Sequence, residues 1–201
     1  MSDIVPVKRA LISASNKEGL IPFAQSLVQN GAEILSTGGT AKALEAEGVP
    51  VTRVETVTGF PEILGGRVKT LHPLIHGGLL GRRDLESDQK QMAEHGIQPI
   101  DLVAVILYQF EKAAQDPELQ KDPAKVIEEI DIGGPAMLRS SAKNFPWVAA
   151  VSDPRQYGPI LIEISVKGGT TLQTRRRLAQ TVFERTSGYD KAISDWFGKK
   201  V

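Results

Sequence analysis

The chain has 201 residues, 41% of them hydrophobic, and its 24 lysines and arginines are balanced by 24 aspartates and glutamates. This length suits one domain with a single core, and the balanced charge gives no reason to expect nucleic-acid binding. No segment is long and apolar enough to span a bilayer, and residues 1–10 do not resemble a signal peptide. With no cysteine present, disulfides and thiolate chemistry are excluded, which favours a cytoplasmic location.

Short apolar segments alternate with helical patterns along the chain. We expect strands at 8–13, 32–35, 49–54, 101–108 and 147–151. We expect helices at 15–30, 40–47, 122–130, 135–144 and 157–166, the first opened by a capping box of Ser15 and Glu18. This alternation predicts a single α/β domain with a mainly parallel sheet. Its core spans about 1–167, and a helical tail over about 170–198 packs against it.

The segment Gly65-Gly66-Arg67-Val68-Lys69 places two cations on alternate positions after a glycine pair. If the segment is extended, Arg67 and Lys69 lie on the same face. Paired glycines also let a bulky ligand approach the backbone. We interpret the segment as a clamp for a compact anion such as phosphate. An ordinary polar turn at the surface would look similar.

Two more glycine pairs follow predicted strand or loop ends. Gly38-Gly39 leads from a strand into a helix, so free N–H groups at the helix start could bind phosphate. An ordinary turn in which Thr40 caps the helix is the alternative. Gly133-Gly134 precedes Pro135 at another helix start, with Asp131 close by. Asp131 could be a helix cap, although it stands a few residues early for one.

His72 and His76 are four residues apart, a spacing that would suit a metal only on a helix. Pro73 between them argues against such a helix. No metal is expected.

Together with these motifs, the segment Thr58-Gly59-Phe60-Pro61-Glu62 followed by residues 65–73 is highly specific. The chain resembles the IMP cyclohydrolase domain of the bifunctional AICAR transformylase/IMP cyclohydrolase family, with further matches at 13–20, 36–42, 76–78 and 142–144. The resemblance implies a methylglyoxal-synthase-like three-layer sandwich with a C-terminal helical extension. It also implies a homodimer.

The family's reaction closes a purine ring: formyl-AICAR loses water and becomes IMP, the last step of de novo purine biosynthesis. The reaction needs orientation, charge stabilisation and proton transfer, and no cofactor. By resemblance, Asp131 would move the proton of the attacking nitrogen and Tyr108 would orient the substrate, while Lys69 and Lys143 would stabilise negative charge or protonate the departing oxygen. The residues expected to bind the substrate are Ser13, Lys17, Ser36, Gly38, Gly39, Thr40, Arg67, Thr70, Ile106, Ile132, Gly133 and Gly134.

Structural interpretations of the same residues stay open. Lys143 could lie on a solvated helix face with Arg139, and Tyr108 could be a core ring. The sequence also departs from the family, which usually has Asn where Ile106 stands and Pro where Gln109 stands. Ile106 cannot form a hydrogen bond with the base, which puts the efficiency of the site in doubt.

The chain is also too short to contain a transformylase domain, which would be a separate or linked partner. Two alternatives remain: a noncatalytic nucleotide-sensing module, and a lyase of the methylglyoxal synthase type. The four expected catalytic residues argue against the sensor. The segments 67–73 and 131–134 argue against the lyase.

Overall fold

The structure, a computed structural model, describes residues 3–200. Five parallel strands form the central sheet in the order β4-β3-β2-β5-β6. They are β2 (Arg9–Ala14), β3 (Glu33–Ser36), β4 (Thr52–Arg53), β5 (Leu102–Ile106) and β6 (Ala149–Val151). A separate antiparallel pair joins β1 (Ile4–Val5) to β7 (Thr170–Thr171). The expected α/β fold with a mainly parallel sheet is confirmed.

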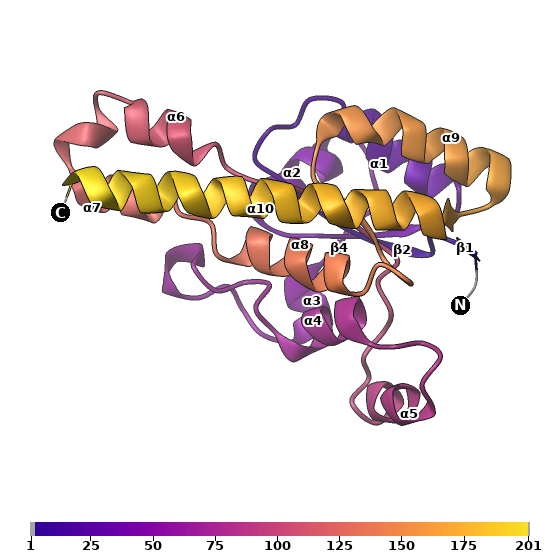
Figure 1. Cartoon of the computed structure of the whole chain (residues 1–201). Helices are drawn as coiled ribbons and strands as arrows, with labels where there is room; N and C mark the ends of the chain where they lie inside the picture. Colours follow the sequence, from indigo (N-terminus) through magenta and orange to yellow (C-terminus); the bar gives the residue numbers. More distant parts are fainter. Residues whose placement is uncertain (1–2, 201) are drawn as a thin grey trace.

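Helices cover both faces of the sheet, so the domain has three layers (Figure 1). One face packs against α1 (Leu20–Gln29), α2 (Gly38–Ala46) and α9 (Tyr157–Lys167). The other packs against α3 (Val54–Thr58), α4 (Pro73–Leu80), α8 (Gly133–Lys143) and α10 (Leu172–Lys200). Because side chains alternate along a strand, Ile12 joins the first core and Leu11 the second. Every residue of β5 is buried, as a central strand requires.

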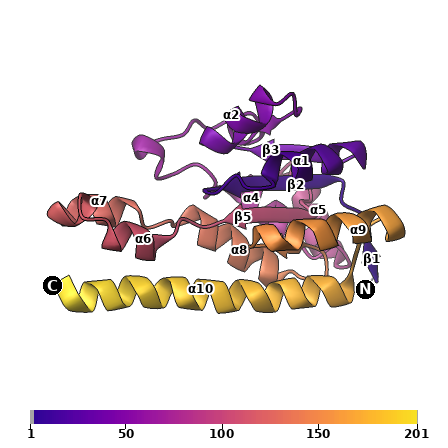
Figure 2. The ribbon, with the colours of Figure 1, turned by 90° about the horizontal axis from the view of Figure 1, so that it is seen from above.

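The long helix α10 extends beyond the sheet (Figure 2). Its far half carries a small separate cluster, formed by Phe110, Val126, Tyr189 and Trp196. Through these contacts α6 (Phe110–Gln115) and α7 (Pro123–Glu128) pack on α10. The remaining helix, α5 (Glu86–Glu94), lies away from the sheet (Figure 1). No helix among residues 3–200 is long and apolar enough to cross a membrane.

The strand order changes direction at β2. From β2 the chain first builds outward through β3 and β4, and later returns to place β5 on the other side of β2. In open α/β sheets, ligands bind beyond the carboxyl ends of the strands at such a switch point. Ala14 and Ile106 pair at the ends of β2 and β5. The topology therefore predicts a binding site at the carboxyl ends of β2 and β5.

Several local expectations were wrong. The first helix begins at Leu20, after Gly19 in the left-handed region (φ 66°), so there is no capping box. Ser15 instead donates its hydroxyl proton to the Leu107 carbonyl at 2.8 Å, which ties the loop to the end of β5. The strand expected at 49–54 shrinks to Thr52–Arg53 because α3 begins at Val54.

Pro73 does not prevent a helix at the histidines. It is the first residue of α4, where a proline needs no hydrogen-bond donor. His72 caps this helix by accepting from the Leu74 N–H, while His76 bonds to the Ser140 hydroxyl at 2.9 Å. The two imidazoles therefore have different partners, and no group of three metal-ligating side chains occurs within residues 3–200.

Candidate functional site

A cavity of about 670 Å³ lies at the carboxyl ends of β2 and β5. It takes in all but two of the residues expected from the sequence to bind substrate or to catalyse. Those that line it are Ser13, Lys17, Gly38, Gly39, Thr40, Arg67, Lys69, Thr70, Ile106, Tyr108, Asp131, Ile132, Gly133 and Gly134. The three glycine pairs, which are far apart in sequence, thus meet at one site.

The start of α2 supplies unpaired N–H groups to this cavity. Its N-cap, Thr37, makes no capping hydrogen bond, and its hydroxyl donates to Glu55 instead, at 3.2 Å. The first-turn N–H groups of a helix have no partner within the helix. Gly38 has a φ of 55°, which a residue with a side chain rarely adopts. This geometry suits a phosphate at a positive helix end.

Two hydroxyls predicted to bind ligand have structural partners. Thr40 does not cap α2: its hydroxyl bonds to the N–H (3.1 Å) and the carbonyl (3.2 Å) of Ala14, which ties α2 to the end of β2. Ser36 is fully buried and donates to the Ile12 carbonyl at 2.7 Å. Ser36 does not line the cavity, whereas Thr40 does, with its hydroxyl bonded to Ala14.

The segment after Gly65-Gly66 is a turn, not a strand. Gly65 (φ 64°) and Gly66 (φ 93°) are both in the left-handed region, and Arg67 has helical angles. Arg67 and Lys69 still line the cavity, but through this turn. A Cβ at Gly66 would lie 2.8 Å from Lys69 Nζ, so glycine at this position makes room for the lysine.

Both cations are paired with carboxylates that the sequence reasoning missed. Arg67 forms a two-pronged pair with Glu128 of α7 at 2.9 and 3.1 Å. Lys69 Nζ lies 3.0 Å from Glu62 Oε2 and near the backbone of Gly38 at the start of α2. Glu62 lies within the motif at residues 58–62, whereas no motif or local pattern in the sequence indicates that Glu128 lines the site. Exposed pairs of this kind contribute little stability, so an anionic ligand can replace the carboxylates.

The start of α8 positions Asp131. Its Oδ1 accepts the Gly134 N–H at 2.8 Å, and its own N–H donates to the Tyr189 hydroxyl at 2.7 Å. The side chain therefore does satisfy a first-turn N–H, as a helix cap does. Burial raises the pKa of the Asp131 carboxyl, and the Gly134 N–H partly opposes that rise. A carboxyl with a raised pKa holds a proton more readily than an ordinary aspartate, which suits it to accept and pass on a proton.

Gly134 is required by this arrangement. A Cβ there would overlap Asp131 Oδ2 and lie 2.8 Å from Leu107 Cδ2. Similarly, a Cβ at Gly133 would lie 2.8 Å from the Thr70 hydroxyl, so α8 and the loop carrying Lys69 are in close contact.

Tyr108 and Ile106 form a different part of the wall. Tyr108 is 54% exposed, so it is not a core ring. Ile106 is 8% exposed and packs in the core below α1 and α9. Its carbonyl accepts the Ser15 N–H at 3.0 Å.

Lys143 is not brought to this cavity. It is the exposed last residue of α8, whereas Asp131 precedes the first. Lys143 stands ten positions after Gly133 in α8, which is about 15 Å along the helix axis. A catalytic role for Lys143 stays a prediction.

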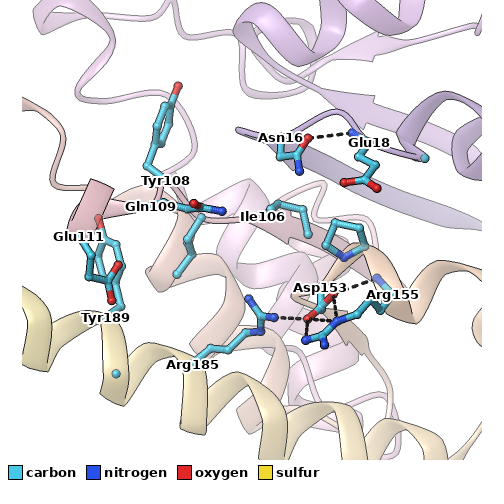
Figure 3. A pocket seen from close by; sticks show the side chains of 14 residues that line it. Asn16, Glu18, Ile106, Tyr108, Gln109, Glu111, Asp153, Arg155, Arg185 and Tyr189 are labelled. Atoms are coloured by element: carbon cyan, nitrogen blue, oxygen red, sulfur yellow. Dashed lines mark hydrogen bonds and ion pairs between the residues drawn. The ribbon is translucent and has the colours of Figure 1, made fainter. Parts of the chain in front are cut away.

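A second cavity, of about 690 Å³, shares Ile106 and Tyr108 with the first (Figure 3). Its two arginines, Arg155 and Arg185, both pair with Asp153. Figure 3 shows Tyr108 pointing away from this charged cluster. The second cavity contains none of the glycine pairs, and we assign the site to the first.

Comparisons with known proteins identify the family of this chain. The family model for the MGS-like domain matches residues 19–136, and that of the AICARFT/IMPCHase bienzyme matches 141–201. Proteins described as bifunctional purine biosynthesis protein PurH are 53% identical in Listeria welshimeri over 96% of this chain and 55% identical in Lysinibacillus sphaericus over 94%. The chain spans 38% and 37% of these two relatives.

A solved structure, described as the crystal structure of ForH, superposes with a TM-score of 0.83 at 39% identity. The match covers 94% of this chain and 98% of that one. The chain therefore belongs to the MGS-like domain family, in the branch represented by the PurH proteins, as the resemblance to the IMP cyclohydrolase domain predicted.

Proposed function

We propose that this chain is an IMP cyclohydrolase, which closes formyl-AICAR to IMP. One observation carries the proposal: a single cavity contains both a helix start with unpaired N–H groups and a carboxylate that accepts a hydrogen bond and has a raised pKa. A ribonucleotide needs the first for its phosphate, and a proton transfer needs the second. The relatives' description as purine biosynthesis proteins supports the same substrate class.

The phosphate is proposed to bind at the start of α2, with Arg67 and Lys69 as its cations. When the phosphate arrives, it displaces Glu128 and Glu62 from these two side chains. Ser13 and Lys17, at the end of β2, would contact the rest of the nucleotide.

In the proposed reaction, the carboxamide nitrogen of the substrate attacks the formyl carbon. As that C–N bond forms, Asp131 accepts a proton from the nitrogen and passes it to the formyl oxygen, which becomes a hydroxyl. Asp131 then accepts the proton of the former formamide nitrogen and delivers it to the hydroxyl. The C–O bond breaks, water leaves, and the former formamide nitrogen forms the C=N double bond of the ring. Lys69 would stabilise charge on the oxygen, and Tyr108 would orient the base.

The direct test is to mix purified protein with formyl-AICAR and follow absorbance, with nucleotide binding measured by calorimetry. Conversion to IMP is the expected result. Binding without conversion would instead make the chain a noncatalytic nucleotide-sensing module. A linked or separate transformylase partner stays a prediction. A homodimer also stays a prediction, and sedimentation would check it.

Arg67→Gln should raise the KM for formyl-AICAR about tenfold and leave kcat within about twofold. The reason is that losing one charge-assisted bond to the phosphate costs about 1.5 kcal/mol in substrate and transition state alike. Steady-state kinetics would check this. Arg82→Gln is the matched control. The Arg82 side chain is as exposed as that of Arg67 (63% against 62%) and also pairs with a carboxylate, that of Asp88, but neither Arg82 nor Asp88 lines the cavity. A fall in kcat with an unchanged KM would contradict the assignment.

Ile106→Asn should raise kcat/KM, since the amide could bond to the base, a gain of about 1–3 kcal/mol if that group is otherwise unpaired. Because Ile106 packs in the core, the same change should lower the melting temperature. Kinetics and thermal unfolding would separate the two effects. Ile106→Val, which adds no polar group, should give no gain in activity. No gain with asparagine would mean that the base does not approach this position.

A further inference from the structure

We propose that Tyr189 of α10 is a positioning residue of this site, because its hydroxyl holds the main chain of Asp131 where the carboxylate must act. The inference deepens the proposed function and rests on it. Tyr189 is 58 residues from Asp131 in sequence and lies in the C-terminal half of α10, within the small cluster that also contains Phe110.

The contact itself is short and directional. The Asp131 N–H donates to the Tyr189 oxygen at 2.7 Å. Tyr189 is 7% exposed, so its ring is fixed by packing, including an edge-on contact with Phe110 at a centroid distance of 6.4 Å. Ile130, the residue before Asp131, packs on the same cluster. The loop is thus held to α10 both by an apolar side chain and by the phenol.

Ring packing alone does not explain a tyrosine here. Phenylalanine would fill the same apolar space, and burying a phenol oxygen is unfavourable unless the oxygen has a partner. At Tyr189 the partner is the Asp131 N–H. Tyr157, the other strongly buried tyrosine, stacks on Phe23 at 4.2 Å, and its hydroxyl has no partner among the described residues. The two tyrosines therefore differ in that the Tyr189 hydroxyl accepts a hydrogen bond and the Tyr157 hydroxyl accepts none within residues 3–200.

Two independent restraints therefore act on Asp131. The Gly134 N–H fixes its carboxylate from within α8, and Tyr189 fixes its backbone from α10. Residues 129–132, between α7 and α8, contain no helix or strand, so the loop needs an external contact. A displacement of about 1 Å at a catalytic group can cost on the order of a hundredfold in rate. Removal of the Tyr189 hydroxyl should accordingly act on turnover.

The decisive variant is Tyr189→Phe, assayed with formyl-AICAR in the full chain at 25 °C. We expect kcat to fall at least about tenfold while KM stays within about twofold, because the nucleotide-binding end of the cavity is untouched. Tyr157→Phe controls for the loss of a buried phenol oxygen. Trp196→Phe controls for loosening of the cluster, because Trp196 packs beside Tyr189 on Phe110. Both controls should keep kcat near the wild-type value.

Other results would overturn the inference. A normal kcat in Tyr189→Phe would show that the hydroxyl has no positioning role, and an equal loss in Trp196→Phe would assign the effect to packing. Hydrogen exchange at the Asp131 amide adds a readout that does not need turnover, with protection expected to fall at least about tenfold in Tyr189→Phe alone. If the wild type proves inactive, the proposed function fails, and unchanged protection would still overturn this inference.

Discussion

Asp131→Asn is expected to lower kcat for the closure of formyl-AICAR by about 10²–10⁴-fold, the usual contribution of a positioned acid or base. The amide keeps the shape of the side chain, and its oxygen can still accept the Gly134 N–H, so the cavity and nucleotide binding should survive. Steady-state kinetics, with calorimetry for binding, would measure both effects. Undiminished turnover would show that Asp131 is not the proton acceptor.

The same variant should be more stable than the wild type at neutral pH. Burial raises the Asp131 pKa, so folding favours the protonated form. The favourable contribution is fully present below the unfolded pKa of about 3.9 and is lost as pH rises through the folded value. Above the folded pKa the ionised carboxylate therefore destabilises the fold, and asparagine removes that penalty. The gain in melting temperature should shrink as the pH approaches 4.

Asp122→Asn is the matched control for both measurements. Asp122 caps α7 by accepting the Ala124 N–H at 3.1 Å, as Asp131 accepts an N–H of α8, but it does not line the cavity. It should leave kcat unchanged. An equal loss of turnover in this control would attribute the Asp131 effect to helix capping.

Gly134→Ala should lower kcat by about tenfold to a hundredfold while lowering the melting temperature only modestly, because the second atom that the new Cβ meets, Leu107 Cδ2 at 2.8 Å, is the end of a side chain that can move. The new Cβ would overlap Asp131 Oδ2, so the carboxylate must move, and a shift near 1 Å is costly for proton transfer. The backbone itself accepts alanine, because Gly134 does not have a positive φ and alanine favours a helix. Steady-state kinetics would measure the loss of kcat, and thermal unfolding would measure the effect on stability separately.

Gly158→Ala offers a close comparison. Gly158 is the second residue of α9, as Gly134 is of α8, and a Cβ there would meet nothing within 4 Å. We expect normal turnover from it. If Gly134→Ala behaved the same way, the placement of the Asp131 carboxylate would not limit the reaction.

The sequence predicted the sheet and the meeting of the glycine pairs well, for physical reasons. A strand such as β5 is buried on both faces, so it appears as an unbroken apolar run. Glycine pairs mark backbone conformations that few other residues adopt, and several proved to have positive φ. The glycine-rich segments that line the cavity could therefore be identified from the sequence, although the one at 65–69 is a turn rather than a strand, and anion binding by them stays a prediction.

Contacts between distant residues could not be predicted in the same way. The Arg67–Glu128 pair spans 61 residues and the Asp131–Tyr189 bond 58, and neither leaves a periodic pattern in the sequence. Helix α3 was missed because its Val-Glu-Thr-Val-Thr sequence is rich in β-branched residues, which favour strands. Lys143 was selected from a motif match, and the structure places it at the far end of α8, outside the cavity, so its catalytic role stays a prediction.

The two halves of α10 have different roles, so the part of the chain that completes the core is shorter than the part that completes the site. Leu178, Ala179 and Val182 belong to the two cores that flank the sheet, whereas Tyr189 and Trp196 belong only to the small cluster beyond it. The shortest segment of chain that can bury the sheet therefore ends near Val182. The shortest segment that can also hold Asp131 in place must continue past Tyr189, so a shortened chain could fold and yet lack a complete site.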